Sequence, residues 1–159
     1  MSRIPITLGG FKRLKAELER LRTVDSKEVI EAIQEARGHG DLSENAEYDA
    51  AKERQGMIEA RIAELESKMS LFEVIDVSEL SGDKVAFGAT VVIENIDTEE
   101  EKEYVIVGSD EVDIFNGRIS VISPVARAML GKSVGEEFTV QAPNGEIEYE
   151  VKSVKFVGE

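Results

Sequence analysis

Apolar residues recur at steps of three and four along the first part of the chain, which is the spacing of one helical face. We expect this helix to begin near Thr7, whose hydroxyl suits an N-cap, and to end where Gly38 and Gly40 interrupt the pattern. Asp25 and Ser26 disturb the spacing, so a bend or a shift of the apolar seam is predicted there. The apolar positions are Leu8, Phe11, Leu14, Leu18, Leu21, Val29, Ile30, Ile33 and Ala36.

A second apolar series alternates steps of three and four, as the seam of a two-stranded coiled coil does. Its members are Tyr48, Ala51, Gln55, Ile58, Ile62, Leu65, Met69 and Phe72. The connection between the two series is only a few residues long, so the helices must run antiparallel. At about 1.5 Å per residue, a helix of roughly 30 residues forms a rod about 45 Å long, which suits the presentation of a few side chains at a distance.

The second half of the chain is rich in valine, isoleucine, glycine and turn signals, which predicts an antiparallel sheet. Asn144-Gly145 is a strong hairpin signal. Ser123 suits the N-cap and Pro124 the first position of a short helix over 124–130, and Gly131 follows where a helix end favours a left-handed residue. The expected strands are Ala89–Ile96, Tyr104–Gly108, Ile119–Ile122, Glu137–Ala142 and Glu146–Val157.

These patterns predict an α+β protein with two domains. Residues 1–77 are expected to form an antiparallel α-helical coiled-coil hairpin, and residues 78–159 a bent antiparallel sheet with one short helix. The segment Ser78–Lys84 is the expected boundary. The phenylalanines of the second half, Phe115 among them, have a spacing that suits core positions, and the acidic run Asp97–Glu103 is read as a solvated hairpin tip.

The amino-acid composition excludes several classes of function. The 159 residues include no cysteine and one histidine, which excludes disulfides, thiolate zinc sites, cysteine nucleophiles and multi-histidine metal centres. The net charge of −14 argues against tight, sequence-independent binding to duplex DNA. No apolar run reaches the length of a membrane helix, and the first residues lack the apolar core of a secretion signal, so we expect a cytoplasmic protein without a membrane association.

The most informative segment is the expected hairpin tip, residues 37–48, where Asp41 and Glu44 stand three positions apart. One interpretation is structural: Asp41 caps the second helix and Glu44 reaches back to a backbone N–H, as in a capping box. The other is chemical, because two carboxylates on one exposed turn can help to hold Mg²⁺ at a site that the ion shares with phosphates. The spacing leaves both interpretations open.

The segment 35–48 resembles the tip of the bacterial Gre transcript-cleavage factors, closest to the GreA type. The segments Ile4–Thr7, Phe87–Val91 and Ile119–Arg127 are similar to the family as well, and they occur in the family's order over nearly the whole chain. The resemblance implies an N-terminal coiled coil and a C-terminal domain of FKBP-like fold. It also implies a protein that inserts its coiled coil into the secondary channel of RNA polymerase and stimulates the polymerase's own cleavage of backtracked RNA, without being an enzyme itself.

The resemblance assigns roles to residues of the tip. Asp41 and Glu44 become the catalytic pair, which shares Mg²⁺ with the polymerase active site only within the complex, so no tightly bound cofactor is expected. Arg37, Lys52 and Arg54 become contacts to the nascent RNA 3′ end or to the channel, and a solvated or ion-paired surface cation is the alternative for each. Asn45 is expected to tune the acidic pair and to contact the channel.

The same resemblance assigns polymerase docking to the loop of Ser123 and Pro124, whose alternative role is to cap the short helix. RNA polymerase and the nascent RNA 3′ end are the expected partners, and we expect a monomer. Two competing functions remain: a channel-binding inhibitor on the same scaffold that does not stimulate cleavage, and a plain coiled-coil adaptor whose tip only caps a helix.

Overall fold

The computed structural model describes residues 3–39 and 44–158. The described chain divides into two compact units. The helical unit contains Lys12–Phe72, and the sheet unit contains Arg3–Phe11 together with the chain from Glu73 onward. The nine residues at the start of the described chain therefore belong with the C-terminal half.

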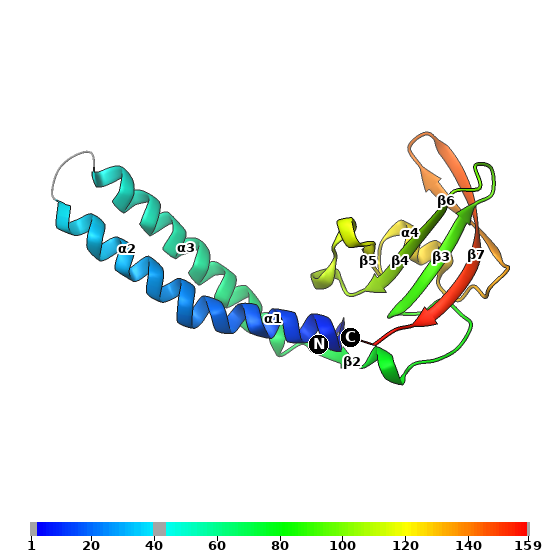
Figure 1. The fold of residues 1–159 in the computed structure, drawn as a ribbon, viewed down its shortest axis with the longest axis horizontal. Coiled ribbons are helices and arrows are strands. Elements are labelled where there is room, and N and C mark those ends of the chain that lie inside the picture. Colours follow the sequence, from blue (N-terminus) through cyan, green and yellow to red (C-terminus); the bar gives the residue numbers. More distant parts are fainter. Residues whose placement is uncertain (1–2, 40–43, 159) are drawn as a thin grey trace. The chain divides into compact units, whose positions relative to one another are not determined.

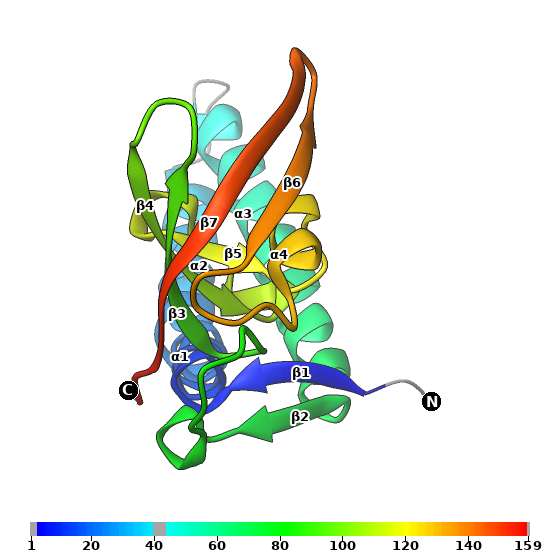
Figure 2. The same cartoon turned by 90° about the vertical axis from the view of Figure 1, so that its right-hand side faces the viewer.

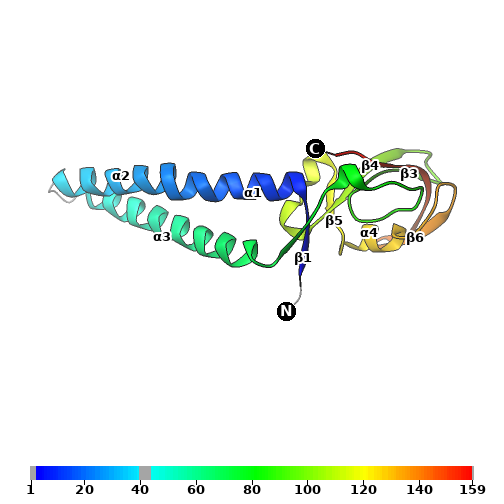
Figure 3. The ribbon, with the colours of Figure 1, turned by 90° about the horizontal axis from the view of Figure 1, so that it is seen from below.

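The helical unit is an antiparallel hairpin. Its first limb contains α1 (Leu8–Arg20), a π-helical turn (Leu21–Asp25) and α2 (Ser26–His39), and its second limb is α3 (Glu44–Met69). Helices α2 and α3 lie side by side in two perpendicular views (Figures 1 and 3). The predicted α3 seam is confirmed, because Ala51, Ile58 and Leu65 are buried and the intervening seam positions are half-buried.

The predicted disturbance of the first helix is the π-helical turn. The backbone N–H of Ser26 donates to the carbonyl oxygen of Leu21, five residues earlier, and the Ser26 hydroxyl donates to the same oxygen at 2.7 Å. A π turn contains one more residue than an α turn. It therefore moves the apolar face around the helix axis between Leu18 and Val29, which are both buried.

Ion pairs between the two limbs join the hairpin, and the shortest of those among the described residues are formed by Arg61 and Arg22. Arg61 of α3 donates from Nε and Nη2 to the two carboxylate oxygens of Glu17 at 2.7 and 3.0 Å. Arg22 of the π turn donates to Glu66 at 2.7 Å. The hydrogen bond from Arg61 lowers the pKa of the Glu17 carboxyl, and the same bond raises the pKa of Arg61.

The sheet unit contains a five-stranded sheet in the described chain, with strand order β5-β4-β3-β7-β6. Figure 2 shows β3, β7 and β6 side by side in this sheet. The strands are β3 (Ala89–Asn95), β4 (Glu101–Val107), β5 (Arg118–Ser120), β6 (Glu137–Ala142) and β7 (Gly145–Phe156). The pairs β3–β4, β3–β7 and β6–β7 are antiparallel, and β6 turns into β7 at the predicted Asn-Gly. The α+β class is confirmed, with a helical hairpin and a sheet that carries one short helix.

The prediction of a wholly antiparallel sheet is wrong at one pair, because β5 runs parallel to β4. The reason lies in their connection. Two short 3₁₀ turns, Ser109–Glu111 and Ile114–Asn116, carry the chain back to the level of Val105, so that β5 runs beside the last three residues of β4, and such a crossover is what parallel neighbours require. The acidic run also differs from its interpretation, since its last three residues, from Glu101 to Glu103, belong to β4.

The short helix α4 (Pro124–Met129) packs on the sheet and completes the core. Ala126 and Met129 are fully buried in one cluster with apolar residues of β3, β4, β6 and β7. The predicted ends of this helix are confirmed, because the Ser123 hydroxyl accepts the N–H of Ala126 at 3.3 Å and Gly131 has a φ of 82°.

A two-stranded sheet of β1 (Ile4–Thr7) and β2 (Phe72–Ile75) was not predicted. Its strands have four residues each and lie far apart in the sequence, so neither shows a clear alternation. Pairing with β1 explains why α3 ends at Met69, whereas the sequence pattern continued the second helix to Phe72. Phe72 is still buried, but it lies in β2.

Candidate functional site

The candidate site is the end of the helical hairpin where α2 stops at His39 and α3 starts at Glu44. Asp41 lies outside the described residues, and Glu44 and Asn45 are described only by their helical backbone. The structure therefore fixes Glu44 as the first residue of α3, where the unpaired N–H groups and the helix dipole favour negative charge. Asp41 is one of the four residues that join His39 to Glu44 in the sequence.

Two of the predicted cations share one surface near this end. Arg37 of α2 and Lys52 of α3 line an open groove of about 250 Å³ between the two helices. Both side chains are exposed, and Lys52 donates to Gln55 at 3.1 Å. The rest of the groove is formed by Ile30, Ile33, Gln34 and Gln55. Two cations on an open surface beside apolar and amide groups can hold a phosphate backbone without reading its sequence.

The third predicted cation, Arg54, does not line this groove. Its Nη2 atom lies 3.4 Å from Oε2 of Glu28 on the facing helix, and both side chains are about half exposed. Exposed pairs of this kind contribute little to stability. The structure thus brings Arg37 and Lys52 together and gives Arg54 an acidic neighbour.

The predicted docking loop has the geometry of a helix cap. Ser123 is half-buried and caps α4, while Pro124 is the exposed first residue of that helix. Ile122 just before them is 65% exposed. One residue of this unit contradicts its sequence interpretation: Phe115, which we assigned to the core, is fully exposed on the second 3₁₀ turn.

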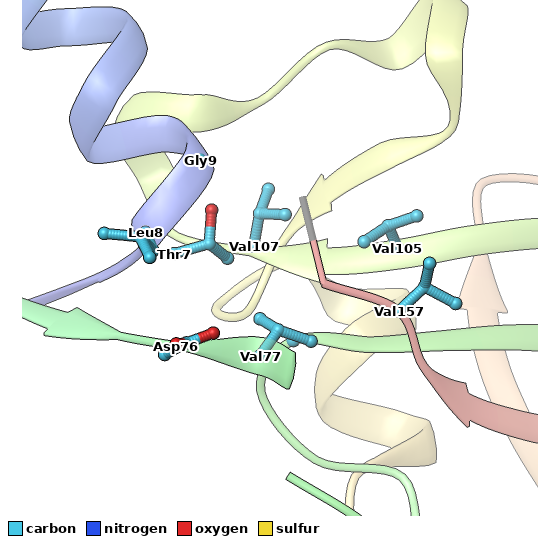
Figure 4. Close-up of a pocket in the computed structure, with 9 residues that line it drawn as sticks. Thr7, Leu8, Gly9, Asp76, Val77, Val105, Val107 and Val157 are labelled. Carbon is cyan, nitrogen blue, oxygen red and sulfur yellow. The ribbon is translucent and has the colours of Figure 1, made fainter. Parts of the chain in front are cut away.

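A second hollow, in the sheet unit, is too small for a ligand (Figure 4). Its volume is about 20 Å³, which is room for one water molecule. Thr7, Val77 and Val107 are among the side chains around it. The described residues contain no group of three or more acidic or histidine side chains placed to hold a metal ion. In the same part of the chain, none of the helices has the length and apolar character needed to cross a membrane.

Comparison with known proteins gives one consistent result. A family model described as the N-terminal part of a transcription elongation factor matches residues 4–74, and a model of the C-terminal part of GreA/GreB matches residues 80–156. Transcription elongation factor GreA of Nitratidesulfovibrio vulgaris (strain DP4) is 60% identical over 158 residues, which cover 99% of this chain and 96% of that protein.

GreA of Caulobacter sp. (strain K31) is 57% identical over 157 residues, which cover 99% of this chain and all of the relative. Among solved structures, a crystal structure of the GreA factor homolog 1 protein of Thermus thermophilus is 29% identical. The alignment covers 96% of this chain and 99% of that one, with a TM-score of 0.44.

Proposed function

The chain belongs to the GreA/GreB family of transcription elongation factors, and from this premise we propose that it stimulates RNA polymerase to cleave backtracked nascent RNA. In this proposal the chain is a cofactor of the polymerase's own nuclease activity. It binds the polymerase as a monomer in the cytoplasm and rescues arrested complexes. The observation that carries the proposal is the 60% identity to a GreA factor over 158 residues.

The proposal divides the work between the two domains predicted from the sequence. The coiled-coil domain, residues 1–77, enters the secondary channel, and the domain of residues 78–159 docks on the channel rim through Ser123 and Pro124. The long antiparallel helices support this division, because the hollow described between them is an open groove rather than an enclosed pocket.

Asp41 and Glu44 are the proposed catalytic pair. Carboxylate oxygens are the ligands that Mg²⁺ prefers, and a site shared with phosphates needs only one or two of them, so this donor set fits the ion. Mg²⁺ at the polymerase centre supplies charge stabilisation to the attacking and leaving oxygens of the phosphodiester. Asp41 and Glu44 would hold that ion together with the polymerase, and would orient the attacking water by accepting its hydrogen bond.

The cations near the tip are proposed to guide the RNA 3′ end. Arg37 and Lys52 are the stronger candidates, because both are exposed and line the same groove. Arg54 has to leave Glu28 in order to contact RNA. Asn45, at the second position of α3, is proposed to contact the channel beside the acidic pair.

The test is an arrested elongation complex mixed with the full chain and Mg²⁺. The proposal expects shortened RNA with 3′ ends that the polymerase extends again. Slowed synthesis without cleavage would instead identify a channel-binding inhibitor, and no effect would identify an adaptor. Either of the last two results overturns the proposal.

Two conservative substitutions separate chemistry from helix capping. Asn caps a helix about as well as Asp, and Gln also serves in a capping box, so Asp41→Asn and Glu44→Gln should each change stability by only a few tenths of a kcal/mol. Both variants should still bind the polymerase and lose most of the cleavage stimulation. Glu59→Gln, an exposed acid elsewhere on α3, is the matched control and should keep it. Near-full activity of both tip variants would show that the carboxylates are structural caps.

A further inference from the structure

One buried carboxylate in the sheet unit is used by neither the proposed chemistry nor the apolar core. Glu111, 8% exposed, belongs to the first 3₁₀ turn after β4. Its Oε2 atom accepts the backbone N–H of Thr7 at 2.9 Å, and its Oε1 atom accepts the Thr7 hydroxyl. Thr7 is separated from Glu111 by 104 positions, so these bonds hold the start of the chain against the sheet.

The geometry at Thr7 is that of a capping box whose glutamate comes from elsewhere in the chain. The Thr7 hydroxyl accepts the N–H of Gly10, the third residue of α1, at 3.1 Å. In an ordinary capping box that third residue is Glu or Gln, whose side chain accepts the N–H of the N-cap. Here it is glycine, and Glu111 accepts the N-cap N–H instead.

Gly10 leaves the space that this arrangement needs. A Cβ atom at Gly10 would overlap the carboxylate of Glu111, and the three heavy atoms nearest to it all belong to that side chain. The first turn of α1 contains no acidic residue of its own. Glu111 therefore supplies the negative charge at the positive end of α1.

The same carboxylate also caps its own turn. Oε2 of Glu111 accepts the N–H of Gly108 at 2.8 Å. One side chain therefore accepts hydrogen bonds from the backbone N–H groups at the start of α1 and at the start of the 3₁₀ turn. Gly108 is equally constrained, because a Cβ there would overlap the carbonyl oxygen of Pro5 in β1. The bonds to both starts fix the first turn of α1 to the segment that follows β4.

We propose that Glu111 is a positioning residue for cleavage stimulation, an inference that rests on the proposed function. Helix α1 is continuous from Leu8 to Arg20, so its first turn belongs to the sheet unit and its remainder to the helical unit. The anchor at Thr7 fixes the turn from which the first limb of the hairpin continues. A catalytic pair carried on that hairpin acts only when it is placed within a fraction of an ångström, so loosening the anchor lowers the rate of the bound factor.

Three variants of the full chain separate this role from simple capping. Glu111→Ala removes both the cap of α1 and the tie to the sheet. Glu111→Ala combined with Gly10→Glu restores a local Thr-x-x-Glu capping box without the tie, and the Ala leaves room for the new side chain. Glu111→Gln is the conservative variant, since one amide oxygen can accept the N–H groups of both Thr7 and Gly108. Glu103→Gln, an exposed acid on β4, is the matched control for loss of one charge.

The assay measures cleavage in arrested complexes over a range of factor concentrations, and unfolding is measured in parallel. Glu111→Ala and the double variant should both lower the rate at saturating factor about tenfold. The double variant should recover the stability that Glu111→Ala loses. The half-saturating concentration should move less than about threefold for both, because the docking loop is intact, and Glu111→Gln should stay within about threefold of the wild-type rate.

Recovery of the saturated rate by the double variant would overturn the proposal, because capping alone would then explain the effect. So would an unchanged rate in Glu111→Ala, or a loss that lies wholly in the half-saturating concentration. If the wild-type chain stimulates no cleavage, the proposed function fails first, and that result is distinct from all of these.

Discussion

Leu65 offers the sharpest test of the helical hairpin. It is 1% exposed on α3, between Arg61 and Glu66, whose side chains pair with Glu17 and Arg22 of the facing limb. Leu65 therefore faces that limb at the level where α1 passes into the π turn. Leu65→Ala removes apolar atoms from this contact and leaves both ion pairs in place.

The expected loss follows from the buried atoms. Leu→Ala deletes three carbons, and at about 0.8 kcal/mol for each buried carbon the transfer contribution is about 2.4 kcal/mol. The cavity left behind adds to this, which gives a destabilisation of about 3 kcal/mol. Met57 lies on the same helix and is 68% exposed, so Met57→Ala should stay within about 0.5 kcal/mol of the wild type.

The measurement is urea unfolding followed by far-UV circular dichroism, which reports mainly the helical hairpin in this chain. The free energies of unfolding of the two variants should differ by more than 2 kcal/mol, with similar m-values. If Leu65→Ala were as stable as Met57→Ala, Leu65 would not be part of a packed interface, and the assignment of the α3 seam would fail.

Two further predictions concern charge. The ion pair of Glu17 and Arg61 should couple by about 0.5–1 kcal/mol in a double-mutant cycle at low salt and neutral pH, since both side chains are more than one-third exposed. Because folding lowers the pKa of Glu17, this coupling is complete above the ordinary pKa of 4.5 and disappears as the pH falls through the lower pKa of the folded state. A coupling energy that persists at acidic pH contradicts this prediction. The isolated chain should bind Mg²⁺ negligibly, because two carboxylates lack the phosphates of a full shell. Calorimetry that detects a tight Mg²⁺ site on the free chain would refute the shared-site proposal.

The features that the sequence predicted well depend on contacts between neighbours in the chain. The α3 seam could be predicted because burial at Ala51, Ile58 and Leu65 follows directly from helical periodicity. The ends of α4 could be predicted because Ser123, Pro124 and their backbone partners lie within one turn. The acidic pair stood out only by its resemblance to a family, since its spacing fits a helix cap equally well.

The features that the sequence did not predict depend on partners far along the chain. The parallel pairing of β5 requires the crossover after β4, and the three residues of β5 have no pattern that fixes their direction. Phe115 is apolar and was assigned to the core, but it lies on a turn and is fully exposed. No local signal connects Glu111 with Thr7; the only trace of their contact is a glycine where a capping box has glutamate.

The separation of Thr7 and Glu111 also sets an order of events during synthesis. The helical unit is complete once Phe72 has been made, and its two shortest interhelical ion pairs join residues 44 positions apart, less than half the separation of Thr7 and Glu111. At about 5–20 residues per second, the ribosome needs roughly 5–20 s to travel the 104 positions from Thr7 to Glu111. During that interval α1 begins without the carboxylate that will cap it. The residues of the hairpin are therefore synthesised first. The hydrogen bonds between Thr7 and Glu111 form only after the C-terminal half has been made.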